Sequence, residues 1–487
     1  MSPAGRNRRP YLWLCGFVAF LGALLLLYSQ TLAFTWDEGF HLLAAQLIVA
    51  GKKPYLDFCF PQTTWNAYWT AAWMRLFGET WRLAHVLAAL LTTGAVMLAA
   101  DYVYSRLPAS RWRMAAAYAA AFLMGLNSAV FEHGTVGQAY GMCLFTTVAA
   151  FRAAVAAKRR EGAGLPALAG FLAGVAAASS LLSAAALPVL LVWTALGKRW
   201  KRAAAFLAGA LVPFLPTLWL LAQAPRQTWF NLFEYQLHYR GATWPDAAQH
   251  DFEVFISWLD SGHALLLILL AVAGLLFIRA SGEWREGVRS EFYLCGWLAL
   301  AIGAEVSSTH PTFPRYYLLV VPFVSILAAA GYYGVGTRAG GSLRPLWPTL
   351  AFGLLIAFGC AKMLYDRRDV YIWRDIEQVA LKVREVTPAQ APLWADENIY
   401  FLTRHAPPSG MEFGYSHTIA DLTPSRAAQL HILSEAQVKR LVEAGAYATV
   451  ETCDLDTDFI DSLELPKLYR QTAEVHDCGV YWDRLQP

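Results

Sequence analysis

Residues 11–34 read YLWLCGFVAFLGALLLLYSQTLAF, an apolar run that contains no charged side chain. A helix needs about 20 apolar residues to cross the hydrocarbon core of a bilayer, so this run is long enough to span a membrane. Arginines precede it, but no small-residue cleavage site follows it, which favours a retained first span over a signal peptide. The stretch Trp36-Asp37-Glu38-Gly39 comes directly after the run and places two carboxylates beside its end.

The composition of the whole chain agrees with a membrane protein. Of its 487 residues, 57% are hydrophobic and only 15% are charged, and the mean hydropathy is +0.36. About 25% of residues are charged in a typical soluble domain, so this chain has too little polar surface to be covered by water alone. The net charge of +3 is small and does not favour nucleic acid as a partner.

Further apolar runs predict a polytopic protein with about eleven transmembrane helices. The run at residues 165–196 is too long for one ordinary span, and we interpret it as two short helices that meet at a polar turn containing Ser179, Ser180 and Ser183. The other runs are Arg82–Tyr104, Met114–Phe131, Ala139–Ala157, Ala203–Leu221, Ala264–Phe277, Phe292–Val306, Tyr316–Val335 and Leu346–Met363.

Basic clusters between these runs predict the topology, because cytoplasmic loops carry an excess of Lys and Arg. If every cluster lies in the cytoplasm, the N-terminus is inside and the C-terminus is outside. Residues 1–364 then form a transmembrane domain with two large outer loops, at 35–81 and 224–262. Both loops are rich in aromatic residues, and we expect them to form short helices on the outer surface. Residues 365–487 follow as a separate soluble domain on the same side.

The C-terminal residues have the pattern of a small α/β domain. Apolar residues at helical spacing predict helices at Asp375–Val386 and Ser434–Ala444. Short apolar runs predict strands at Pro392–Ala395, Ala446–Glu451 and Val480–Asp483. Cys453 and Cys478 both lie in this segment, and a disulfide between them is left open because the sequence does not give their distance. The fold class is therefore an all-α membrane domain followed by a small extracytoplasmic α/β domain.

Asp37 is the first candidate for a catalytic residue. Placing carboxylates beside lipid costs free energy, so their presence needs an explanation. Either they mark the start of a helix at the membrane interface, or they take part in catalysis. In the chemical interpretation, Asp37 accepts the proton of an acceptor hydroxyl and acts as a general base. The neighbouring Glu38 would support it.

The residues around Asp37 carry a family resemblance. Asp37-Glu38-Gly39-Phe40-His41-Leu42 is followed by Gly51-Lys52-Lys53-Pro54-Tyr55 and, further on, by Phe60-Pro61-Gln62 and Trp81-Arg82-Leu83. This loop resembles the first outer loop of the GT-C glycosyltransferases. It is most similar to the bacterial branch of families 39 and 83, whose members are similar to protein O-mannosyltransferases and to the aminoarabinose transferase of lipid A. The resemblance implies that Asp37 is the catalytic carboxylate and Glu38 the second acid of the motif.

The chain departs from this family pattern at two places. Family members often have an acid near the start of the fourth span, and here either Glu132 replaces it or the role is absent. Phe60-Pro61-Gln62 stands where the aminoarabinose transferases have a Lys-Pro-Pro step, so the resemblance does not extend to the aminoarabinose substrate.

Several basic and aromatic residues of the outer loops are candidates for substrate binding. A phosphate leaving group needs cationic stabilisation, and Arg315 next to Tyr316 could bind it through two parallel hydrogen bonds. A snorkelling arginine is the alternative interpretation. The secondary candidates are Lys53 and Arg240, for which a solvated loop position is the competing interpretation, and His133, for which it is a hydrogen-bonded pair with Glu132. His133 beside Glu132 is too small a set to define a metal site.

The resemblance predicts a membrane glycosyltransferase of the bacterial inner (cytoplasmic) membrane. Its donor would be a polyprenyl-phosphate sugar, its acceptor a lipid, glycan or protein on the outer side, and transfer would invert the anomeric centre in one displacement. No cofactor is implied, and a divalent metal is left open. Asp454-Leu455-Asp456 has the spacing of a nucleotide-sugar metal motif, but we interpret it as a solvated turn. The alternatives are a lipid or sugar transporter, which would carry ionisable groups within its spans, and a non-catalytic scaffold.

Overall fold

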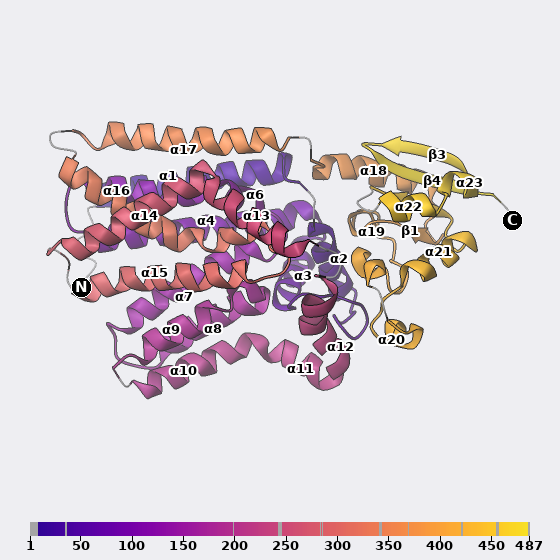
Figure 1. The fold of residues 1–487 in the computed structure, drawn as a ribbon, viewed down its shortest axis with the longest axis horizontal. Helices are drawn as coiled ribbons and strands as arrows, with labels where there is room; N and C mark the ends of the chain where they lie inside the picture. Colours follow the sequence, from indigo (N-terminus) through magenta and orange to yellow (C-terminus); the bar gives the residue numbers. More distant parts are fainter. Residues whose placement is uncertain are drawn as a thin grey trace. The chain divides into compact units, whose positions relative to one another are not determined.

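The computed structural model describes residues 8–34, 37–197, 199–241, 246–282, 284, 286–339, 343–368, 370–419, 422–453 and 457–485. Trp36 and the predicted turn at Asp454-Leu455-Asp456 lie outside these residues. The chain divides into two compact units. Unit 1 comprises residues 1–29, 85–215 and 246–369, and unit 2 comprises residues 30–84, 216–245 and 370–487. Helices make up most of both, and a small sheet lies near the C-terminus (Figure 1).

Unit 1 consists of helices joined by short connections. Its elements, two of which continue into unit 2, are α1 (Arg8–Thr31), α4 (Trp81–Arg106), α5 (Trp112–Gly125), α6 (Ser128–His133), α7 (Tyr140–Ala157), α8 (Gly164–Ser179), η2 (Leu181–Ser183), α9 (Ala186–Ala195), α10 (Trp200–Leu211), η3 (Val212–Phe214), α13 (Ala247–Asp260), α14 (Gly262–Ala280), α15 (Glu286–Ser307), η5 (Pro314–Leu319), α16 (Val321–Ala339) and α17 (Leu346–Asp366).

Small residues let the helices of unit 1 approach closely. A Cβ added to Gly331 of α16 would lie 2.0 Å from the Leu270 carbonyl oxygen of α14, and one added to Gly170 of α8 would lie 1.9 Å from the Phe206 oxygen of α10. Backbone contact of this kind is how helices associate in lipid, where no hydrophobic effect drives them together. The α14–α16 and α8–α10 pairs therefore depend on glycine at these positions.

Six helical segments in the described part of the chain are long and apolar enough to cross a membrane: Arg9–Thr31, Trp81–Arg106, Tyr140–Ala157, Trp200–Gln223, Gly262–Ala280 and Leu346–Asp366. The run predicted at Leu165–Leu196 is divided into α8 and α9 at Ser180 and η2, as its serines indicated. These helices are shorter than an ordinary span. The count of about eleven spans stays a prediction.

Two predicted spans have different boundaries in the structure. The run at 114–131 is split, because Asn127 ends the connection after α5 and caps α6, its side-chain oxygen accepting a hydrogen bond from the Val130 N–H at 3.3 Å. The run at 316–335 begins as the 3₁₀ segment η5, and the long helix α16 starts only at Val321. Tyr316 thus lies in a tight turn that precedes the helix.

Unit 2 combines the first outer loop, part of the second and the C-terminal residues. Its helices are α2 (Glu38–Val49), α3 (Trp65–Phe77), α11 (Leu215–Gln223), α12 (Pro225–Trp229), the π-helix η4 (Phe230–Tyr239), α18 (Trp373–Val386), α19 (Glu397–Thr403), η6 (Gly414–Thr418), α20 (Pro424–Gln429), α21 (Glu435–Glu443), α22 (Thr457–Ser462) and α23 (Leu465–Leu468). The outer loops do contain short helices, as the sequence predicted. The predicted boundary at residue 365 stays a prediction, since unit 2 is larger than the C-terminal segment.

The sheet of unit 2 has four strands in the order β1-β2-β4-β3. The strands are β1 (Leu393–Trp394), β2 (Thr449–Thr452), β3 (Tyr469–Val475) and β4 (Cys478–Arg484). β1 pairs with β2 in parallel, with Leu393 opposite Thr449, and β4 runs antiparallel to both of its neighbours. A disulfide joins Cys453, just after β2, to Cys478 at the start of β4.

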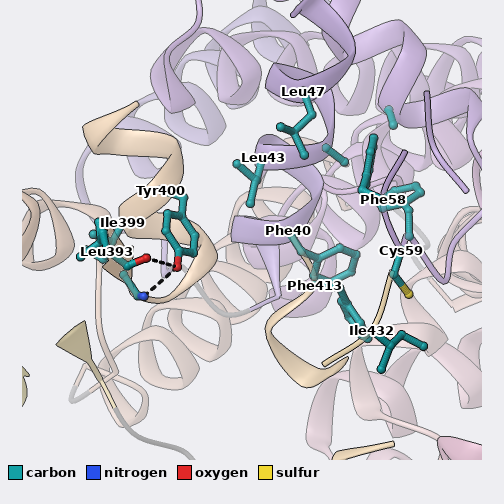
Figure 2. Packing of buried hydrophobic residues seen from close by; sticks show 14 of the residues in the cluster. Phe40, Leu43, Leu47, Phe58, Cys59, Leu393, Ile399, Tyr400, Phe413 and Ile432 are labelled. Carbon is teal, nitrogen blue, oxygen red and sulfur yellow. Dashed lines mark hydrogen bonds between the residues drawn. The ribbon is translucent and has the colours of Figure 1, made fainter. Parts of the chain in front are cut away.

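One hydrophobic core joins the three segments of unit 2. Phe40 and Leu43 of α2, Phe58 of the following loop and Tyr400 of α19 are buried in it (Figure 2). The Tyr400 hydroxyl donates to the Leu393 carbonyl oxygen and accepts from the Ala395 N–H, both at 3.0 Å, so this buried polar group is satisfied. The first outer loop is therefore packed against the C-terminal residues and does not stand free.

Buried hydrogen bonds fix the same segments to one another. Asn231 of η4 accepts a hydrogen bond from the Phe60 N–H at 2.7 Å, and Gln236 donates to the Pro61 carbonyl oxygen at 2.7 Å. His431 of the C-terminal segment lies 2.7 Å from the Leu56 carbonyl oxygen. The Phe60-Pro61-Gln62 stretch is thus held by the second outer loop.

Candidate functional site

The two acids of the first outer loop have different environments. Asp37 immediately precedes α2 and is partly exposed, whereas Glu38 is the first residue of α2 and is fully buried. The Glu38 carboxylate accepts a hydrogen bond from the Trp373 indole N–H at 2.8 Å, and the Trp373 ring stacks on Trp81 with ring centres 5.3 Å apart. Asp37 can therefore meet a substrate, while Glu38 fixes the start of α2 to α18.

The start of α2 lies directly against the start of α19. Gly39 faces Asn398, and a Cβ at position 39 would lie 2.4 Å from the Asn398 Oδ1 atom and 3.0 Å from its backbone nitrogen. Only glycine fits this approach without displacement of α19. Gly39 thus allows α2 to approach α19 closely, which brings the neighbouring Asp37 toward residues 396–398.

Carboxylates from the C-terminal segment gather beside Asp37. Burial, together with the negative charges of Asp396 and Asp37, raises the pKa of Glu397 to about 7, and a hydrogen bond from the Gly414 N–H opposes that rise. Burial and the charges of Asp396 and Glu397 also raise the pKa of Glu451 well above its usual range. Part of this cluster therefore holds protons at neutral pH.

The backbone around these acids is fixed by hydrogen bonds and the disulfide. The Asp396 N–H donates to the Glu451 Oε2 atom at 3.1 Å, and the Cys453 N–H donates to the Asp396 Oδ2 atom at 3.2 Å. Glu451 lies close to the sulfur atoms of Cys453 and Cys478. Those sulfurs are bonded to each other and cannot act as thiolate ligands, so this group does not fit a metal site.

The basic residues of the two outer loops are engaged elsewhere in unit 2. The Lys53 ammonium lies 5.5 Å from the centre of the Trp219 ring, and Arg240 donates to the Gln236 side-chain oxygen at 3.2 Å. Lys52 pairs with the buried Glu412, with 3.6 Å between Nζ and Oε1. These contacts place Lys53 and Arg240 within the packing of the loops, and a role in substrate binding stays a prediction.

A second cluster, in unit 1, contains Glu132 and His133 at the end of α6. Both side chains are buried. The Glu132 carboxylate pairs with Arg367, just after α17, at 2.5 Å from Nη1. Burial raises the pKa of Glu132 to about 6, and the charge of Arg367 and its hydrogen bond oppose that rise.

Arg315 belongs to this second cluster. Burial lowers the pKa of His133, and the charges of Arg315 and Arg367 lower it further, so His133 is neutral. The Arg315 guanidinium lies over the ring of Phe313, 4.4 Å from its centre, and 5.6 Å from that of the buried Tyr316. Among the described residues, two guanidinium groups gather here beside the Glu132 carboxylate, an arrangement that suits an anion such as a phosphate.

The structure therefore gathers the predicted residues into two sets. Asp37 and Glu38 lie in unit 2, whereas Glu132, His133, Arg315 and Tyr316 lie together in unit 1. Sequence reasoning missed Glu397 and Arg367. A signal for Arg367 was present, because Arg367-Arg368 follows the last predicted span on the side where few basic residues are expected.

Comparisons with known proteins agree with the expected fold. ArnT from Cupriavidus metallidurans bound to undecaprenyl phosphate superimposes with a TM-score of 0.67 at 15% identity, covering 98% of both chains. The oligosaccharyltransferase of Archaeoglobus fulgidus, in complex with zinc and sulfate, matches with a TM-score of 0.52 at 15% identity, covering 93% of this chain and 69% of that one. No curated protein sequence matches significantly.

The family comparison is based on sequence and is independent of these superpositions. The profile of glycosyltransferase family 87 matches residues 58–308, just over half of the chain. The predicted membership of the GT-C glycosyltransferases is thereby confirmed, with family 87 as the matching family in place of families 39 and 83. With several apolar helices that can cross a bilayer, the protein is a multi-pass membrane glycosyltransferase. The chain belongs to glycosyltransferase family 87.

Proposed function

We propose that the protein transfers a monosaccharide from a polyprenyl-phosphate donor to an acceptor hydroxyl, with Asp37 as the general base. The observation that carries this proposal is Asp37 itself, a partly exposed carboxylate at the start of α2 in a chain of this family. Support for the donor class comes from the ArnT structure with bound undecaprenyl phosphate and from the Archaeoglobus fulgidus oligosaccharyltransferase AglB in complex with a dolichol-phosphate, which matches with a TM-score of 0.50.

The proposed reaction is a single displacement. The acceptor hydroxyl oxygen attacks the anomeric carbon while the bond from that carbon to the phosphate oxygen breaks. The bonding electron pair leaves with the polyprenyl phosphate, and the hydroxyl proton passes to the Asp37 carboxylate. The configuration of the anomeric carbon is inverted. A dedicated general acid is not needed, because the phosphate leaves as an ionised group.

The Arg315 and Arg367 guanidiniums are the proposed holders of the donor phosphate. Their excess charge over Glu132 can stabilise the negative charge that develops on the leaving oxygen. Glu132 is then a partner that holds Arg367, although the sequence suggested it as a third catalytic carboxylate. Tyr316 and the neutral His133 line the same cluster and would position the donor head group.

The proposed topology has about eleven spans, a cytoplasmic N-terminus and the C-terminal residues outside a bacterial inner membrane. The disulfide between Cys453 and Cys478 supports an outside location, because disulfides persist in oxidising compartments. A reporter enzyme that is active only outside the membrane, fused at the C-terminus, should be active. An inactive outside reporter together with an active cytoplasmic one would reverse this orientation.

The transporter alternative predicts ionisable groups near the middle of the spans. Ion pairs do occur in unit 1, between Asp101 and Arg152 at 2.7 Å and between Glu291 and Arg106 at 2.8 Å. Asp101 lies in the last turns of α4 and Glu291 in the first turns of α15. These pairs therefore join helix ends, as structural pairs do, and do not form a path through the helices.

The experiment that tests the function is release of polyprenyl phosphate by purified protein in lipid nanodiscs. A panel of polyprenyl-phosphate sugars is offered with a cell-envelope extract as acceptor, with and without a chelator. We expect the wild type to turn over one donor and Asp37→Asn to lose about 10²–10⁴-fold in rate, the usual contribution of a general base. The matched control is Asp483→Asn, an exposed aspartate of β4. Full activity of Asp37→Asn would remove Asp37 from the mechanism.

A further inference from the structure

A cavity of about 400 Å³ lies in unit 2, between the second outer loop and α20. From the loop it is lined by Arg226, Gln227, Trp229 and Glu234, and from α20 by Arg426 and Gln429. Its volume is within the range of small-molecule sites in proteins, which is about 300–1,000 Å³. None of these residues belongs to the acid cluster around Asp37 or to the cluster around Glu132.

The walls of this cavity are held in place. Phe230, next to Trp229, is fully buried in the core of unit 2. On the other side, Ala427 of α20 and Leu430, which directly follows α20, are buried in the same core. Arg426 forms an ion pair with Glu234 and so joins the two walls. The cavity therefore has a defined shape without a ligand.

The chemistry of the lining favours one class of ligand. Trp229 is 56% exposed and offers a flat apolar ring, and the Phe233 ring lies beside it, tilted by 37°, with 4.7 Å between the ring centres. Around it are amide, guanidinium and carboxylate groups, which are planar and include both donors and acceptors. A sugar ring has the matching properties, because one face presents C–H groups and the edge presents hydroxyls that both donate and accept. A purely apolar ligand would leave the side-chain amides of Gln227 and Gln429 to face it without hydrogen-bond partners.

We propose that this cavity binds a saccharide unit of the acceptor, stacked on Trp229 and hydrogen-bonded to Gln227, Gln429 and the Arg426–Glu234 pair. The proposal rests on the transferase function and narrows the acceptor to a glycan or a glycan-bearing molecule. Arg226 adds a positive charge at the rim, since no ion pair of Arg226 occurs within the described residues. An acidic substituent on the saccharide would therefore bind more tightly than a neutral one.

Binding is measured directly, so that the test does not depend on turnover. The full-length protein in nanodiscs of neutral lipid is applied to an array of bacterial envelope oligosaccharides, neutral and acidic. We expect retention on a subset of the array, a loss of at least tenfold in Trp229→Ala and Gln429→Ala, and no change in Trp347→Ala, an exposed tryptophan of α17. In the transfer assay, Trp229→Ala should raise the KM for acceptor, whereas Trp347→Ala should not.

Each outcome decides for or against the cavity. Oligosaccharide binding that depends on Trp229 supports the saccharide site, whether or not any donor is turned over. If binding occurs and no donor is turned over, the transferase proposal fails and the saccharide site stands. Equal oligosaccharide binding by wild type and Trp229→Ala would overturn it. Retention of no oligosaccharide by the wild type would overturn it as well. Arg226-dependent binding to anionic-lipid vesicles would then identify the cavity as a lipid head-group site.

Discussion

Two carboxyl groups, Glu397 in unit 2 and Glu132 in unit 1, are both shielded from water but have opposite neighbours. Acids surround Glu397, and their charges add to the effect of burial, so its pKa rises to about 7. Glu132 has an arginine instead, which opposes burial and keeps the pKa at about 6. The first site thus collects groups that can hold a proton, and the second presents positive charge. This difference is the basis on which we propose proton transfer at the Asp37 cluster and anion binding at the Arg315–Arg367 cluster.

The largest effect is expected from a substitution that moves Asp37 away from α19. In Gly39→Ala the new Cβ would lie 2.4 Å from Asn398 Oδ1 and 3.0 Å from the Asn398 backbone nitrogen, so the Asn398 side chain must rotate and α2 and α19 must separate slightly. A displacement of about 1 Å in an active site can cost about 100-fold in rate. We expect kcat in the polyprenyl-phosphate release assay to fall about 10–100-fold.

A second substitution shows whether the collision causes this loss. Asn398→Ala removes the side-chain atoms that the new Cβ meets, so the double variant should recover part of the lost rate. Gly16→Ala in α1, where nothing lies within 4 Å, is the matched control and should behave as wild type. Wild-type kcat in Gly39→Ala would show that the approach of α2 to α19 is not required.

The next largest effect concerns the arginine side of the comparison. Arg367→Ala removes one of two guanidiniums and leaves the Glu132 carboxylate buried without its partner. We expect the KM for donor to rise about tenfold, the value of one charge-assisted hydrogen bond, and the melting temperature to fall. Adding Glu132→Gln should restore the melting temperature but not the KM, because only the unpaired charge is removed.

The neighbouring arginine provides the control for this pair of variants. Arg368→Ala removes an exposed guanidinium that lies over the Tyr365 ring, and it should leave the donor KM unchanged. The single variant Glu132→Gln tests most directly whether Glu132 only holds Arg367. A fall in kcat as large as that of Asp37→Asn would make Glu132 a catalytic carboxylate, as the family resemblance first suggested.

Local sequence patterns predicted the parts of these sites that depend on neighbouring residues. The apolar run before Asp37, the break at Ser179–Ser183 and the amphipathic helix α18 were all visible, because each is determined by residues within a few turns. β3 was missed because Arg470, Gln471 and Thr472 are exposed, so this edge strand has no apolar alternation to reveal it.

The partners of the site residues could not be found in the same way. Glu397 meets Asp37 only because three distant segments share one core, and nothing in either local pattern indicates that contact. The same is true of Arg367 and Glu132, which belong to different helical segments of unit 1. Sequence reasoning thus proposed Asp37, Glu132 and Arg315 one by one, but the electrostatic difference between the two clusters required the structure.

The smallest expected effect is the dependence of stability on pH. The folded pKa of Glu397, about 7, lies above the ordinary value of 4.5, so folding favours the protonated form. Its stabilising contribution is complete below about pH 4.5 and is lost as the pH rises to about 7. Glu397→Gln mimics the protonated group. At pH 8 we expect its unfolding free energy to exceed that of the wild type by about 1–3 kcal/mol, with a higher melting temperature. At pH 4.5 the two proteins should melt at the same temperature. Glu385→Gln, exposed on α18, should not change this profile. If Glu397→Gln and wild type lost stability equally between pH 4.5 and 8, the acids around Asp37 would not hold a proton at Glu397, and the contrast with Glu132 would disappear.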